Sequence, residues 1–229
     1  VIKNLTIRVG NCIAEGENLD AYGYDCSGEC GGTAELDECG TCDSNPSNDC
    51  ISYCLELNSG ANLKSFYALP EDASAASIMS PLGANVSGII TEGGACSQIA
   101  IGTYVGSHCE IHAEHGYWVL VTYDDSLCLE AIPHSEDIEY NLHSGANLIS
   151  FPYDGTISMG DALPDNIEVA ITGIITEGGA CTQIAQNTWV GSQCSFIGGK
   201  GYWVISNMDI YFTFELNSTT RSNKTNSKK

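Results

Sequence analysis

Basic residues are scarce in this chain, and the shortage limits the partners that it can bind. The 229 residues include 8 Lys and Arg against 29 Asp and Glu, a formal net charge of −21 at pH 7. Half of these bases lie after Leu216, whereas every acid lies before it. An acidic body of this kind repels the phosphates of nucleic acids and anionic membrane surfaces. We therefore expect no nucleic-acid partner.

Long hydrophobic runs and enzyme motifs are also missing from the sequence. No stretch reaches the roughly 18 apolar residues that predict a membrane-spanning helix, so we expect no membrane insertion. The sequence contains no G-x-S-x-G, H-E-x-x-H or glycine-rich phosphate-binding motif. We therefore expect a protein that is not an enzyme.

Cysteine, in contrast, is abundant. The chain has 12 cysteines, an even number, which is typical of disulfide-bonded proteins from oxidising compartments. The Cys39-x2-Cys42 spacing also suits a structural zinc site, but thiolates for zinc are unexpected where disulfides form. The cysteines therefore predict an extracellular or cell-surface protein.

A constant step of 85 residues relates two copies of one sequence pattern. The matching phrases are Ser59–Leu63 with Ser144–Leu148, Gly88–Cys96 with Gly173–Cys181, and Gly116–Val119 with Gly201–Val204. We interpret this as the duplication of a whole domain. The expected organisation is an N-terminal strand (1–11), a Cys/Asp-rich module (12–51), β repeat domain 1 (52–133), β repeat domain 2 (137–216) and a Ser/Thr/Asn-rich basic tail (217–229).

The pattern within each copy predicts a mainly β fold. Short apolar stretches, separated by Gly and Asn, predict about five strands per copy, including single strands over 98–105 and 183–190. Short helical turns are expected near 73–79 and 159–163. We predict two tandem small β-sandwich-like domains, preceded by a disulfide-rich module dominated by loops.

Two observations predict three disulfides in the repeats. One cysteine pair recurs at the same spacing in both copies, which indicates a disulfide within each copy. Another pair, near the start and the end of copy one, has no counterpart in copy two and predicts a clasp between the first and last strands. The predicted bonds are Cys96–Cys109, Cys181–Cys194 and Cys54–Cys128. The other six cysteines leave 15 connectivities open within residues 12–50.

The first nine residues alternate in the manner of a β-strand. Leu5, Ile7 and Val9 share one face, and Thr6 and Arg8 share the other. Such a strand either caps this chain's own repeat domain or completes the sheet of a neighbouring molecule by strand addition.

Residues 12–50 contain many acids and almost no apolar side chains. Oxygen ligands from aspartates in a disulfide-pinned loop suit calcium, and the expected ligands are Asp20, Asp25, Asp37 and Asp43. The alternative is that these acids are simply solvated on a loop. Residues 25–42 resemble the Asp-Cys-x-Gly-x-Cys-Gly-Gly modules of secreted bacterial proteins, which are loosely similar to thrombospondin type 3 calcium repeats. The Gly-Ala-Asn-Leu and Gly-Tyr-Trp-Val phrases resemble tandem modules of large secreted bacterial proteins, which implies an extracellular surface role.

Two further features bear on surface chemistry. The N-x-S/T pattern predicts glycan acceptors at Asn85, Asn217, Asn223 and, within the expected strand, Asn4. Trp118 and Trp203 lie in apolar strands, so we expect them in the core; the alternative is that they stack on sugars.

Two function classes remain. In the first, the chain is a structural subunit that joins copies of itself head to tail into an extracellular filament or surface appendage. In the second, it is a carbohydrate- or surface-binding module of a larger secreted protein, with glycans as partners.

Overall fold

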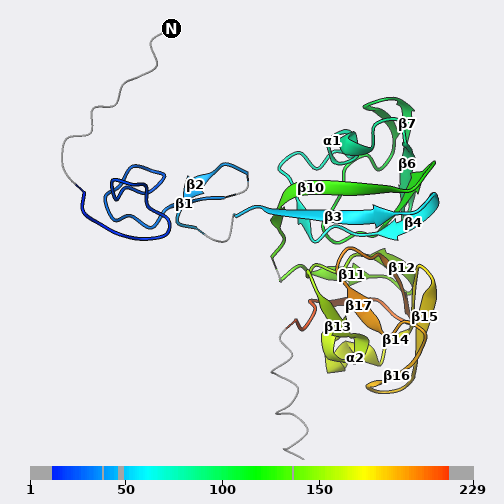
Figure 1. The fold of residues 1–229 in the computed structure, drawn as a ribbon. Helices are drawn as coiled ribbons and strands as arrows, with labels where there is room; N and C mark the ends of the chain where they lie inside the picture. Colours follow the sequence, from blue (N-terminus) through cyan, green and yellow to red (C-terminus); the bar gives the residue numbers. More distant parts are fainter. Residues whose placement is uncertain (1–11, 38, 46–48, 136, 217–229) are drawn as a thin grey trace, which may run out of the picture. The chain divides into compact units, whose positions relative to one another are not determined.

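The computed structural model describes residues 12–37, 39–45, 49–135 and 137–216. The chain is mainly β and divides into two compact units, Val1–Ile51 and Ser52–Lys229 (Figure 1). The first boundary coincides with the predicted end of the Cys/Asp-rich module. Both copies of the repeat belong to the second unit, so they pack together instead of folding as two separate units.

Unit 1 has little regular structure. Its two short strands, β1 (Glu35–Leu36) and β2 (Cys42–Asp43), form an antiparallel pair. Three disulfides link its described residues: Cys12–Cys30, Cys26–Cys42 and Cys39–Cys50. Because almost no apolar side chain is buried in this part of the chain, these bonds take the place of a core.

Each copy in unit 2 contains a five-stranded antiparallel sheet of the same topology. In copy one the order is β4 (Gly60–Lys64), β9 (Tyr117–Val121), β6 (Val86–Thr91), β7 (Gly94–Ala100) and β8 (Thr103–Gly106). In copy two the order is β12 (Gly145–Ile149), β18 (Tyr202–Ser206), β14 (Ile171–Thr176), β15 (Gly179–Ala185) and β16 (Thr188–Gly191).

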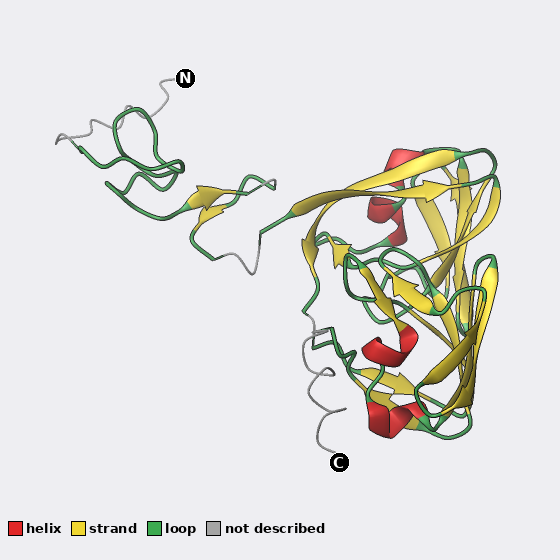
Figure 2. Cartoon of the chain, turned by 60° about the horizontal axis from the view of Figure 1, so that its bottom comes forward, coloured by secondary structure: helices red, strands yellow, loops and turns green. Residues whose placement is uncertain are grey.

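A smaller sheet completes each copy. In copy one it is β3 (Ile51–Leu57), β10 (Asp125–Pro133) and β5 (Ala68–Leu69). In copy two it is β11 (Tyr140–Leu142) with β19 (Ile210–Phe212), and a further pair joins β13 (Thr156–Ser158) to β17 (Ser195–Ile197). Short helices lie on the same side of the five-stranded sheets (Figure 2): α1 (Ala75–Ile78), the 3-10 turn η1 (Ser80–Leu82), α2 (Met159–Ala162) and α3 (Asp165–Glu168).

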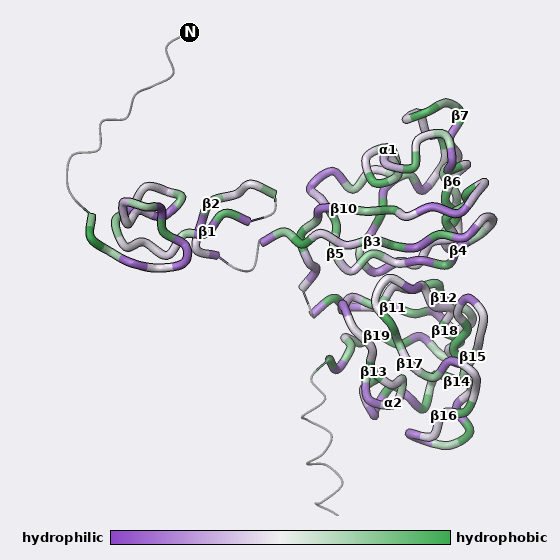
Figure 3. The backbone as a smooth tube through the Cα atoms, in the orientation of Figure 1, coloured by the Kyte–Doolittle hydropathy of each residue, from purple (hydrophilic) through white to green (hydrophobic). Residues whose placement is uncertain are grey.

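Alternating sequence patterns place one face of these strands in the core. In β3, Tyr53, Leu55 and Leu57 are buried while the residues between them are exposed. Figure 3 shows the same short alternation of hydrophobic and hydrophilic residues along β3 and β10. In β9, Tyr117 and Val119 face the core. This is the pattern expected of antiparallel strands with one buried face.

The helical turns predicted near 73–79 and 159–163 are confirmed. In α1 the N-cap Ser74 accepts a hydrogen bond from the backbone N–H of Ser77, and in α2 the N-cap Ser158 accepts one from Asp161. The single strand predicted over 98–105 is wrong, as is its counterpart over 183–190. Each stretch is a hairpin whose turn needs a left-handed residue, supplied by Gly102 (φ 73°) and Asn187 (φ 59°).

Candidate functional site

The aspartates predicted to bind calcium close turns in unit 1. Asp20, Asp25 and Asp37 each begin the same five-residue turn. In each turn, a side-chain oxygen of the aspartate accepts a hydrogen bond from the backbone N–H of the fifth residue. The donors are Tyr24 at 3.0 Å, Glu29 at 2.8 Å and Thr41 at 2.6 Å. The fourth residue of every turn is a glycine with positive φ. The repeated Asp-x-x-Gly spacing is thus a turn motif.

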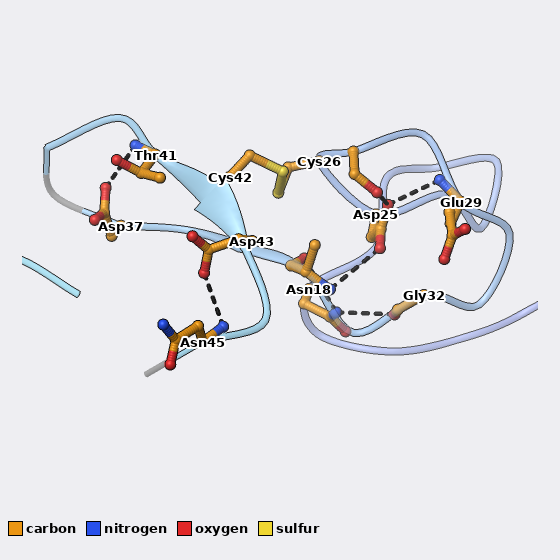
Figure 4. Close-up of a disulfide and its surroundings, with 12 residues drawn as sticks. Asn18, Asp25, Cys26, Glu29, Gly32, Asp37, Thr41, Cys42, Asp43 and Asn45 are labelled. Atoms are coloured by element: carbon orange, nitrogen blue, oxygen red, sulfur yellow. Dashed lines mark hydrogen bonds between the residues drawn. A yellow bond between two sulfur atoms is a disulfide. The ribbon is translucent and has the colours of Figure 1, made fainter. Parts of the chain in front are cut away.

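Asp25 is the most deeply placed of these carboxylates, with 4% of its surface exposed. It accepts hydrogen bonds from the Ser27 hydroxyl (2.7 Å), the Glu29 N–H (2.8 Å) and the Ala34 N–H (3.1 Å) (Figure 4). The Ser27 hydrogen bond, more than the backbone N–H groups, lowers the pKa of this carboxyl below its usual value. The carboxylate therefore organises unit 1 in its charged form.

The side chains of Asp43, the fourth predicted ligand, and of Asn18 also bond to the backbone of unit 1. Asp43 accepts the backbone N–H of Asn45 (2.7 Å), and the Asn18 side-chain amide donates to the Gly32 carbonyl (3.1 Å). Among the described residues, no three His, Cys, Asp or Glu side chains converge as a metal site would require. Calcium binding by unit 1 stays a prediction.

The predicted glycan acceptors have different outcomes. Asn85 is only 1% exposed, and its side chain bonds to Asp125 and to the backbone of Thr122 and Tyr123. A glycan on this nitrogen would have to replace some of these bonds, and glycosylation of Asn85 stays a prediction. Asn4, Asn217 and Asn223 lie outside the described residues, as do the assembly residues Leu5, Ile7 and Val9.

The disulfides within unit 2 join the pairs that the spacing predicts. Equivalent bonds join Cys96 to Cys109 and Cys181 to Cys194, and a bond present only in copy one joins Cys54 on β3 to Cys128 on β10.

Two recurring glutamates connect the copies across their interface. Glu92 of copy one accepts the backbone N–H of Leu148 in copy two at 2.7 Å. Glu177, its counterpart 85 residues later, accepts the N–H of Leu63 in copy one at 3.0 Å. Each copy therefore gives and receives the same contact, as in a two-fold symmetric dimer. The sequence signal was present in the unchanged Thr-Glu-Gly-Gly phrase, but no residue pattern within one copy reveals its distant partner.

Main-chain contacts repeat the same reciprocity. Gly116 donates to the Leu148 carbonyl and Gly201 to the Leu63 carbonyl, both at 3.2 Å. A Cβ at Gly116 would lie 2.8 Å from the Ile149 carbonyl oxygen, and the equivalent atom at Gly201 would lie as close to a copy-one carbonyl. The first residue of each Gly-Tyr-Trp-Val phrase is thus a glycine because the other copy's backbone approaches it closely.

One histidine makes the interface asymmetric. His143 Nε2 lies 2.6 Å from Glu92 Oε1, whereas the equivalent position in copy one is Asn58. The pKa of His143 is raised, first by the Ser144 carbonyl that its ring contacts and then by Glu92.

The small sheets of the two copies differ in length. In copy one, β3 has 7 residues and β10 has 9; in copy two, β11 and β19 have 3 each. Residues 213–216, which follow β19, have no strand partner among the described residues, although Phe214 is 5% exposed. The Glu215 N–H donates to the Ala162 carbonyl at 2.8 Å, so α2 holds one side of this segment. Within the described part of copy two, no strand thus corresponds to the first half of β3 in copy one.

The tryptophans expected in the core lie on the opposite face of the sheet. Trp118 and Trp203 are half-buried on the outer face of the five-stranded sheets, and the neighbouring Tyr117 and Tyr202 fill the core. The apolar character of these strands correctly predicted that each strand contributes to the core. Because side chains alternate between the two faces of a strand, only every second residue lies in the core, and the tryptophans fall on the other face.

Comparison of the chain with family models, curated proteins and solved structures gives no match. Within the described residues, no helix has the length and apolar character that crossing a bilayer requires.

Proposed function

We propose that this chain is a structural subunit of an extracellular filament or cell-surface appendage. In this proposal, residues 1–9 of one molecule add as a strand to the small sheet of copy two in the next molecule. The observation that carries the proposal is the shortened β11–β19 sheet, which has three-residue strands where copy one has seven and nine.

The residues beside the shortened sheet suit an incoming strand. Residues 213–216 continue β19 beyond its Tyr140–Phe212 pair, and the buried Phe214 lies in this segment. A strand that adds beside residues 213–216 supplies main-chain hydrogen bonds and places alternate side chains over the core. The Leu5, Ile7 and Val9 spacing matches that requirement.

Charge supports the same pairing. The first nine residues contain Lys3 and Arg8 and no acid, whereas the acceptor region carries Glu139, Asp209 and Glu215. Opposite charges favour the encounter of these two regions.

The repeat interface explains why growth needs a separate contact. Because each copy already receives the Glu92 or Glu177 contact of the other, this two-fold interface is closed and cannot add a third copy. A donor strand at one end and an acceptor in copy two form a heterologous contact instead, and such contacts generate open filaments.

Two substitutions in the full chain test strand addition. Ile7→Lys puts a charge on the face that must be buried, and Thr6→Lys puts the same charge on the opposite face. Electron microscopy and sedimentation should show filaments for the wild type and Thr6→Lys but none for Ile7→Lys. Filaments of normal length from Ile7→Lys would refute the proposal.

The half-exposed tryptophans favour a second candidate function, the binding of carbohydrate on the outer sheet face. This alternative requires a monomeric chain that binds oligosaccharides and loses binding on Trp118→Ala and Trp203→Ala substitution. Calorimetric titration with oligosaccharides distinguishes the two functions, because the filament subunit should show no heat of sugar binding.

A further inference from the structure

Cross-strand neighbours form two rows on the outer face of each five-stranded sheet. We call these four rows the outer rows, and they are defined by the strand registers. In copy one they are Leu63–Trp118–Ile90–Ala95 and Ala61–Leu120–Gly88–Ser97–Val105. In copy two they are Leu148–Trp203–Ile175–Ala180 and Ala146–Ile205–Gly173–Thr182–Val190.

We infer that the outer rows form a docking surface for a second copy of this chain, so that subunits pair sheet to sheet along their sides. Both views place the two five-stranded sheets along one side of unit 2, away from the helices (Figures 1 and 2). Pairing of this kind is separate from the end-to-end contact proposed above.

The outer rows continue an interface that already exists within unit 2. Leu63 and Leu148, at the inner end of each first row, are buried to 1% and 2% exposure by the other copy. Along the same rows, Ile90 is 42% exposed and Ile175 is 48% exposed. A surface that is buried at one end and apolar along its whole length has the composition of an interface core.

Charge identifies the occupant as another copy. No residue of the outer rows is charged, although the chain as a whole carries a net charge of −21. Two such acidic bodies repel each other wherever their acids face, so an uncharged face is where they approach at the lowest electrostatic cost. The charged Glu92 and Glu177 lie two residues beyond Ile90 and Ile175, at the rim of the apolar rows.

The chemistry of the rows disfavours a sugar as the occupant. Carbohydrate recognition combines aromatic stacking with polar groups that bond sugar hydroxyls, but Ser97 and Thr182 supply the only side-chain hydroxyls in the rows. The isoleucine, leucine and valine side chains beside the tryptophans are instead suited to packing against an equivalent sheet face. The near two-fold repetition of the rows also makes the surface self-complementary.

The test uses the full chain in an Ile7→Lys background, which removes strand addition and leaves side-by-side pairing. Sedimentation velocity should show a concentration-dependent dimer in this background. Adding Ile90→Glu and Ile175→Glu should weaken dimerisation at least about tenfold, because each dimer would bury unpaired carboxylates. The matched control adds two charges at exposed apolar positions outside the rows, Tyr123→Glu and Val169→Glu, and should dimerise as the background does.

Three outcomes would overturn the inference. In the first, the Ile7→Lys chain would stay monomeric at every concentration although the wild type pairs side by side. This result would show that residues 1–11, and not a second sheet, occupy the outer rows. Alternatively, the Ile90→Glu and Ile175→Glu chain dimerises as tightly as the control. Finally, a monomeric chain changes its tryptophan fluorescence on adding oligosaccharide, which would assign the surface to a glycan. Near-UV circular dichroism confirms that each variant is folded, and strand addition is judged separately by whether Ile7→Lys abolishes filaments.

Discussion

Substitution of Gly116 by alanine tests whether the two copies form one body through a close two-fold contact. The added Cβ would lie 2.8 Å from the Ile149 carbonyl oxygen and 2.9 Å from Leu148 Cδ1. The first of these atoms is backbone and cannot rotate away, so the copies must separate slightly. Overpacking of this kind costs about 1–3 kcal/mol. For a unit of this length, each kcal/mol lowers Tm by roughly 2–4 °C.

The matched control is Gly173→Ala, in β14 of copy two. Its Cβ would meet its nearest neighbour, the Cys181 carbonyl oxygen, at an ordinary 3.5 Å. Differential scanning calorimetry should show a lower Tm for Gly116→Ala and for the equivalent Gly201→Ala, with little change for the control. A Gly116→Ala protein that melts at the wild-type temperature would refute the close contact between copies.

Three further predictions concern the disulfides and the aspartates. Replacing Cys54 and Cys128 by alanine should lower the free energy of unfolding of unit 2 by about 4 kcal/mol, because the bond closes a loop of 74 residues; an unchanged denaturant midpoint would contradict this. Asp25→Asn should loosen unit 1 at neutral pH. Since folding lowers the pKa of Asp25, its contribution is present above the ordinary value of 3.8 and is lost as pH falls through the lowered value, so wild type and variant should converge in acid when followed by hydrogen exchange. If unit 1 binds calcium, a chelator should lower its melting temperature, and identical melting curves would remove the metal from the account.

The parts of the fold that depend on local pattern could be predicted from the sequence. Alternation identified most strands, and the serines at the start of α1 and α2 act as expected of N-caps. The hairpin turns at Gly102 and Asn187 were missed because each lies between apolar residues a few positions away, Ile99 and Tyr104 in copy one and Ile184 and Trp189 in copy two, so that each stretch resembled one strand. The signal was the correspondence of Gly with Asn, the two residues that most readily adopt a left-handed conformation.

The functional features depend on residues that are distant in sequence, and these were less predictable. The identity of Glu92 and Glu177 showed that the position matters without showing what each carboxylate contacts. Their partners, Leu148 and Leu63, lie in the other copy, and only the packing of two copies into one unit brings them together. For the same reason, the sequence did not distinguish two copies packed together by reciprocal contacts from two copies that follow each other without such contacts.

The difference between the two small sheets illustrates a second limit. The sequence shows that copy two lacks the counterparts of Cys54 and Cys128, but both copies contain a comparable apolar stretch before the Ser-Gly-Ala-Asn-Leu phrase. The shortening to β11 arises because the chain enters copy two through residues 134–139, which are not in a strand where described. Strand length here is set by the connection between copies rather than by propensity.

Hydrogen exchange at residues 213–216 tests strand addition most directly. In the assembled wild type, the backbone amides of this segment other than Glu215, whose N–H already donates to the Ala162 carbonyl, should exchange at least about tenfold more slowly than in the unassembled Ile7→Lys chain, since an added strand would bond to them. Equal exchange of residues 213–216 in the two samples, with new protection elsewhere in unit 2, would contradict head-to-tail assembly through copy two.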